Sequence, residues 1–419
     1  MIEIKDYKRY FPTFTTPNGT SQIEYLRQTV FDQAKIKYGE ITDEIKNRIE
    51  YELSVYEKFD YVNCVLVIAD LINDLKQNGV EFSCAGTQSG SIINYLLGIT
   101  EDDPIKYGFL FERYISDDEP YKARYPFYCL HSDSENIGKI IKIIKNKYGK
   151  YSIIKTKPLS YSLEDYIFGI NLEELDIFDK TKSHKKQCVL SELEAASIGL
   201  FGLTIFNEQL LNILTECKRT IKAELAFNIN SCTDLKTWEY VSSGKFVNPE
   251  VIKRKIKNTD PVIEMVFKDR YRAELRNLED LEGFISIGGF STGLPFERYI
   301  TLFNEYKSLI PQEKLICQED GMQIIHKLSG WSLSKCNTAR KLIAKHKFTD
   351  IILDKFILDS IKNGYSETYA ENILKELKHN LLYLKTKTWT VFYAFILYQL
   401  AYISLYYPEE YAKAVEKYQ

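Results

Sequence analysis

Within the stretch "SCAGTQSGSIINYLLGIT", residues 83–100, small residues give way to a run of apolar ones. Glycine and serine at this change suit the start of a helix, where free backbone N–H groups point outward and can hold an anion. One interpretation is that Gly86 to Ser91 bind a nucleotide phosphate. The other is a Gly/Ser turn that only caps the helix, and both remain open.

Helices are predicted on both sides of this loop. Residues 43–58 place Ile45, Ile49, Leu53 and Val55 near one face, as in an amphipathic helix. The run "CVLVIADLINDLKQNG", residues 64–79, predicts a second helix that stops at Gly79.

The sequence after the loop changes from mixed to helical. "ENIGKIIKIIKNKYG", 135–149, has isoleucines at helical spacing, a basic opposite face and an end at Gly149, and "YSIIKT" predicts a short strand. Further helices are predicted near 206–223, 320–329, 335–347, 364–379 and 389–405. We therefore expect an α/β first half and a helical second half.

Composition limits the possible classes. The chain has 419 residues, with 55 basic against 58 acidic, so any nucleic-acid surface must be local. Eight cysteines without a CxxC pair and a charged N-terminus without an apolar core predict a reduced, cytoplasmic protein with no secretory segment. The uncharged run at 388–408 is long enough to span a bilayer, but its polar residues and tyrosines favour a buried helix and no membrane association.

Five stretches resemble one family, the alpha subunit of bacterial DNA polymerase III, a C-family replicative polymerase. "GSIINYLLGITEDDPIKYGFLFERY", residues 90–114, is similar to a family motif of the same length. The others are "YFPTFTTPNGTSQIEYLR" (10–27) and the runs at 38–82, 315–347 and 383–415. They follow the family's order along the chain.

The resemblance implies a palm with the polymerase beta-like nucleotidyltransferase fold, in which three carboxylates hold two magnesium ions. Two of these acids alternate along a strand, so that both lie on one face. The family's strand falls on "PFYCLHS", 126–132, which places Phe127, Cys129 and His131 at the acid positions. The later acid falls on Gly202 or Gly199, depending on register. We therefore expect no catalytic carboxylate and no bound metal or other cofactor.

The resemblance also suggests which binding residues are retained. Gly86, Thr87, Gly90 and Ser91 would be the remnant of a nucleotide-binding loop that has lost its arginine. The expected DNA-binding residues are Arg340, Lys341, Lys345, Lys347 and Lys387. A fingers motif is reduced to "GGFSTG" near 288–293.

The implied domains are a palm-like domain at 1–215 and a helical fingers-like domain at 216–419. The family's thumb would be largely deleted near 150–192.

Two alternatives concern acids and soft ligands near the strand. Asp133 and Glu135 are spaced by two and could form a shifted metal pair, although an acidic cap on the following helix is simpler. Cys84, Cys129 and His131 could bind zinc, although such residues more often lie in a core.

The sequence thus predicts a catalytically inactive polymerase homologue that binds template DNA or the replisome in replication, repair or mobile-element biology. Its expected partners are single-stranded or primer-template DNA, an active polymerase or another replisome protein. A decoy subunit that pairs with an active polymerase, and a residual nucleotidyltransferase that uses Asp133 and Glu135, stay open.

Overall fold

The computed structural model divides into two compact units, Met1–Glu208 and Gln209–Gln419. It describes residues 7–17, 19–116, 125–156, 163–175, 177, 188, 190–207, 209–221, 232–242, 315, 317–345, 347, 350–381 and 384–418. The predicted fingers remnant at 288–293 lies outside these residues. The predicted domain boundary at 215/216 falls inside helix α8, Gln209–Ile221.

Three helices begin the first unit. They are α1 (Gln22–Tyr38), which starts with a capping box between Ser21 and Glu24, α2 (Asp43–Lys58) and α3 (Val62–Gln77). The prediction of a helix over 43–58 is confirmed. The helix predicted over 64–79 begins at Val62 and ends at Gln77. Short elements follow: η2 (Thr87–Gly90), α4 (Ile92–Leu96), α5 (Pro104–Tyr107) and η3 (Phe111–Arg113).

A mixed four-stranded sheet forms the centre of this unit, in the order β1-β4-β3-β2. Strand β1 (Tyr128–Ser132) is parallel to β4 (Phe201–Asn207), and β3 (Leu163–Phe168) is antiparallel to both β4 and β2 (Ile153–Lys155). The predicted α/β character of the first half is confirmed. The segment in which a deletion was predicted, 150–192, contributes β2 and β3.

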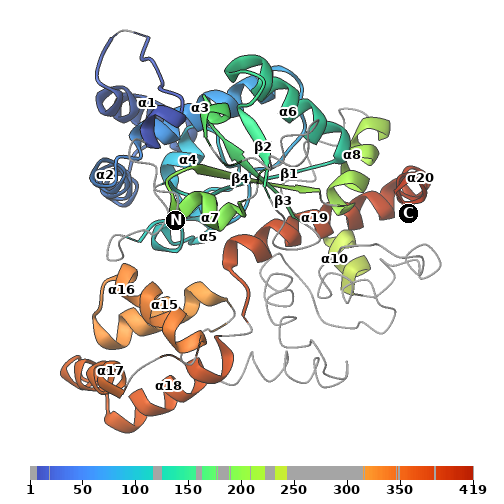
Figure 1. Ribbon diagram of the computed structural model, residues 1–419. Helices are drawn as coiled ribbons and strands as arrows, with labels where there is room; N and C mark the ends of the chain where they lie inside the picture. Colours follow the sequence, from blue (N-terminus) through green and yellow to red (C-terminus); the bar gives the residue numbers. More distant parts are fainter. Residues whose placement is uncertain are drawn as a thin grey trace. The chain divides into compact units, whose positions relative to one another are not determined.

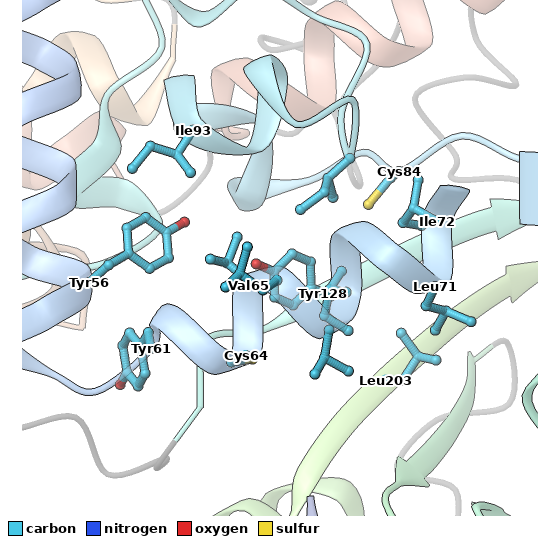
Figure 2. Close-up of a cluster of buried hydrophobic side chains, with 14 of the residues drawn as sticks. Tyr56, Tyr61, Cys64, Val65, Leu71, Ile72, Cys84, Ile93, Tyr128 and Leu203 are labelled. Atoms are coloured by element: carbon cyan, nitrogen blue, oxygen red, sulfur yellow. The ribbon is translucent and has the colours of Figure 1, made fainter. Parts of the chain in front are cut away.

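Alternation along the strands gives the sheet two different faces. The back face carries Tyr128, Leu130, Leu203 and Ile205, which share one buried core with α3 and with α6 (Ser134–Tyr148). Figure 2 shows Val65, Leu71 and Ile72 of α3 around Tyr128 and Leu203. In Figure 1, α3 and α6 lie together beside the strands.

The front face carries the side chains of the alternate positions. Cross-strand pairing sets Cys129 beside Thr204 and Thr204 beside Asp165. Helix α7 (Glu192–Ser197) packs on β3 and β4, where Ala195 and Ile167 belong to a second, smaller core.

The second unit is helical wherever the structure describes it. Helix α19 (Lys387–Tyr406) contacts α8, α10 (Leu235–Ser242) and α20 (Pro408–Lys417), and α20 also contacts α8. The other described helices are α15 (Gln318–Ser329), α16 (Leu333–Ala344), α17 (Asp350–Lys362) and α18 (Glu367–Asn380). The start of the helix predicted over 206–223 was wrong, because Phe206 and Asn207 belong to strand β4.

Helix α19 is the one described helix that is long and apolar enough to cross a membrane. Most of it is buried within the protein, with 72% of its most apolar window covered. It is therefore typical of a core helix, as its polar residues and tyrosines predicted.

Candidate functional site

The loop before α4 is held by a carboxylate of the protein itself. Glu52 of α2 accepts hydrogen bonds from the backbone N–H groups of Ile92 (3.0 Å) and Ile93 (3.2 Å) and from the hydroxyl of Ser91 (2.6 Å). Ser91 also caps the helix by accepting a bond from the backbone N–H of Asn94. The exposed N–H groups that suggested a phosphate site therefore already bind an anion, and the capping interpretation of Ser91 is confirmed.

Arg48, one turn before Glu52, completes this arrangement. Its Nε lies 2.6 Å from Glu52 Oε1, and its Nη2 donates to the carbonyl oxygen of Gly90 at 2.6 Å. Burial raises the pKa of the fully buried Glu52 carboxyl, while Arg48 and the hydrogen bonds oppose this shift. A sequence signal for Glu52 existed, because it lies on the same helical stripe as Ile45 and Ile49.

Packing explains two of the glycines in the loop. A Cβ at Gly90 would lie 2.6 Å from the backbone oxygen of Leu110. Gly86 has φ +127°, which L side chains rarely adopt, and the Gln88 amide lies against it. Thr87, the remaining predicted nucleotide-binding residue, begins η2 and is half-buried. The glycines thus have structural roles that do not require a nucleotide.

Gln88 joins the same loop to the edge of β1. Its Nε2 donates to the carbonyl oxygens of Cys129 (2.9 Å) and Ala85 (2.8 Å). Beside it, Ser83 and His131 exchange two backbone hydrogen bonds as an isolated bridge. The outer edge of β1 is therefore covered by side-chain and backbone partners.

The front face brings together most of the positions where acids were expected. Cys129 and His131 are buried on β1, and Gly202 lies on the same face of β4, two residues before Thr204. Phe127 lies just before β1 and is 37% exposed, and Gly199 precedes β4 with φ +93°. His131 stacks on Phe206, with ring centroids 4.5 Å apart and planes 6° from parallel.

Asp165 is a front-face residue that the sequence analysis missed. It is 3% exposed, and its Oδ1 accepts a 2.8 Å hydrogen bond from the Thr204 hydroxyl. The sequence did indicate this position, because Asp165 lies two residues from both Leu163 and Ile167 and so shares their face of a strand. Asp165 is the one carboxylate on the front face of the four described strands.

The zinc alternative is not supported by the geometry. Among the residues that the structure describes, no three His, Cys, Asp or Glu side chains are grouped so as to hold a metal ion. Cys84 accepts a long 3.6 Å contact from Gln88, and burial raises the pKa of its thiol to about 12.

Asp133 and Glu135 do not converge on a metal position. Asp133 is the N-cap of α6 and accepts bonds from the backbone N–H (2.8 Å) and the side-chain Nδ2 (2.7 Å) of Asn136. Glu135 is exposed and pairs with Lys139 at 2.7 Å. The predicted acidic cap is confirmed by this geometry.

The predicted DNA-binding residues have different environments. Arg340 is 5% exposed, and its guanidinium donates to Gln318 Oε1 (2.9 Å) and Asn337 Oδ1. Lys341 and Lys387 are half-buried, whereas Lys345 and Lys347, at the end of α16, are exposed. Arg340 therefore joins α15 to α16, and the two exposed lysines are the better placed for a phosphate.

A small mixed sheet backed by helices, followed by a helical unit, is compatible with a polymerase-like fold. Residues 24–161 match the family described as the bacterial DNA polymerase III alpha NTPase domain. Along nearly its whole length, the chain is similar to alpha subunits of bacterial DNA polymerase III.

Similar proteins include the DNA polymerase III subunit alpha of Aquifex aeolicus, 24% identical over 98% of this chain and 45% of the relative. That of Staphylococcus aureus is 22% identical over 97% of this chain and 46% of the relative. The error-prone DNA polymerase of Vibrio campbellii is 27% identical over 51% of this chain and 22% of the relative. The chain spans less than half the length of these relatives.

Proposed function

We propose that this protein is a catalytically inactive relative of the polymerase III alpha subunit that binds single-stranded or primer-template DNA. Catalytic inactivity is inferred from the front face of the sheet. Asp165 is the one carboxylate on the described strands there, and its neighbours are Cys129, His131, Gly202 and Thr204.

Two-metal phosphoryl transfer needs several oxygen ligands that together neutralise the developing charge. One Asp165 oxygen already accepts a hydrogen bond from Thr204. Cys129 and His131 supply soft or neutral donors, and His131 is stacked on Phe206. A single carboxylate in this setting is a poor magnesium site.

The DNA-binding part rests on the chain's relatives and on its surface lysines. The relatives are DNA polymerases by name, and Lys345 and Lys347 are exposed at one end of α16. Lysines so placed bind phosphates without reading sequence. We expect the 150–192 segment, in which the family's thumb would be largely deleted, to give little grip on a duplex.

Primer extension with Mg²⁺ or Mn²⁺ tests whether the protein is catalytically inactive. We expect no product from the wild-type chain. Extension that persists through purification and disappears in Asp165→Ala would overturn inactivity and place the residual chemistry on the front face. If Asp133→Ala abolishes it instead, the shifted acid pair is the nucleotidyltransferase site.

Binding of short oligonucleotides tests whether Lys345 and Lys347 contact DNA. We expect Lys345→Gln/Lys347→Gln to weaken binding and reduce its salt dependence. Affinity equal to wild type would remove these lysines as the contact.

A second candidate function is pairing with another protein, such as an active polymerase. Leu358 and Ile361 of α17 are 57% and 41% exposed, which is unusual for large apolar side chains on one helix. Co-purification of the chain with a polymerase, lost in Leu358→Glu, would support this alternative.

A further inference from the structure

Lysines are concentrated on one segment behind the sheet. Residues 134–156 contain six lysines and one glutamate, although the whole chain has a formal net charge of −3. Within this segment α6 buries Ile137, Ile140 and Ile144 in the core of the back face. Its lysines consequently lie on the opposite, solvent-exposed side of the helix.

The lysines of this segment differ in their ion pairs to the residues that the structure describes. Lys139 pairs with Glu135, and Lys147 pairs with Asp70 and Asp74 of α3. Lys142, Lys145 and Lys150 are exposed and make no ion pair with any residue that the structure describes. We call these three the lysine face.

We propose that the lysine face binds the phosphate backbone of a nucleic acid. Cations without a described ion-pair partner on a helix and the turn after it attract a polyanion and release its counterions. Protein partners usually require an apolar centre to the contact. Residues 134–156 include no exposed large apolar side chain, which favours phosphate over protein.

The lysine face is separate from the site described above. Helix α6 packs against the back of the sheet, whereas Asp165 and Thr204 lie on its front. The inference does not depend on Lys345 and Lys347, which belong to the other unit.

The test uses the full chain and a labelled oligothymidylate across a salt series. The variant Lys142→Gln/Lys145→Gln/Lys150→Gln is compared with Lys35→Gln/Lys46→Gln/Lys106→Gln, which removes the same charge from exposed lysines elsewhere in the first unit. We expect the lysine-face variant to bind roughly tenfold more weakly, with a log–log salt slope smaller by about 2, since each lost single-strand contact removes about 0.7. Circular dichroism checks that both variants fold.

Affinities and slopes equal to those of the control variant would overturn the proposal. So would loss of binding to poly-L-glutamate with unchanged binding to the oligonucleotide, because the partner would then be an acidic protein. The Lys345→Gln/Lys347→Gln variant separates the two sites. Binding lost only in that variant supports the proposed function and refutes the lysine face.

Discussion

At the scale of single residues, Glu52 fixes the geometry of the loop before α4. Its carboxylate bonds Ser91, Ile92 and Ile93 and lies beside the Arg48 guanidinium. Because these groups share the buried Glu52 carboxyl as their hydrogen-bond acceptor, the loop and α2 form one structural unit. A phosphate approaching the start of α4 would have to displace this carboxylate.

Replacing Glu52 should therefore be costly. We expect Glu52→Gln to lower the free energy of unfolding by about 2 to 4 kcal/mol, because Arg48 loses its buried partner. Glu50→Gln is the matched control: Glu50 lies in the same helix, but its ion pair with Arg27 is solvent-exposed, so its loss should cost under about 1 kcal/mol. Urea unfolding compares the two, and equal losses would show that Glu52 contributes no more than a surface acid.

Asp102 should make stability depend on pH. Burial, aided by nearby Glu101, raises the pKa of this half-buried carboxyl to about 7, with Lys106 opposing. The folded state therefore holds the proton more tightly than the unfolded state, whose Asp pKa is about 3.9. This contribution is fully present at low pH and is lost as pH rises from about 4 to about 7.

We accordingly expect Asp102→Asn to gain about 1 to 2 kcal/mol at pH 8 relative to wild type, and nothing near pH 3.5. Unfolding measured across this range, with the exposed Glu57→Gln as control, provides the check. A pH-independent difference between Asp102→Asn and wild type would contradict the assignment.

Individual residues were predictable from sequence where a local rule applied. Asp133 directly precedes an amphipathic run, and helix N-termini favour acids there. Asp165 and Gln88 were missed because their roles depend on partners far along the chain, Thr204 and Cys129.

At the scale of elements, helices with one buried face were the most predictable. The isoleucines of α6 and the apolar stripe of α2 predicted which face each helix buries. A glycine follows the end of α6. Strand β4 was missed because both of its faces are largely buried, so "FGLTIFN" shows no alternation of apolar and polar residues.

Two glycines offer a matched test of how η2 packs on η3. We expect Gly90→Ala to destabilise the protein by about 2 kcal/mol or more, because the new Cβ would meet the backbone oxygen of Leu110, which cannot easily move. Gly138→Ala in α6 meets nothing within 4 Å and should stabilise it by about 0.5 to 1 kcal/mol. Thermal unfolding reports both, and the same sign of change in both variants would be inconsistent with this packing.

At the scale of the whole molecule, the resemblance supplied what local patterns could not. It gave the polymerase III alpha-like character of the chain and the strand at 126–132. It did not anticipate β3, whereas β2 agrees with the short strand that "YSIIKT" predicted. Palm-like and fingers-like roles for the two units, and the deletion of a thumb, stay predictions.

The fold should also stand without a metal ion. Hydrogen bonds and stacking account for Cys84, Asp165 and His131, so we expect a chelator to leave the melting temperature of the whole chain unchanged. Scanning calorimetry with and without EDTA measures this. A clear fall with chelator, reversed by zinc but not by magnesium, would point to Cys84, Cys129 and His131 instead.

The covered edge of β1 has a consequence for self-association. An edge strand usually offers a row of unpaired backbone groups on which another chain can add a strand. Here Ser83 and Gln88 already bond the backbone of His131 and Cys129 on that side. Molecules of this protein therefore cannot join their sheets through β1 unless the loop first detaches, which protects this apolar sheet against fibre-like growth from that end.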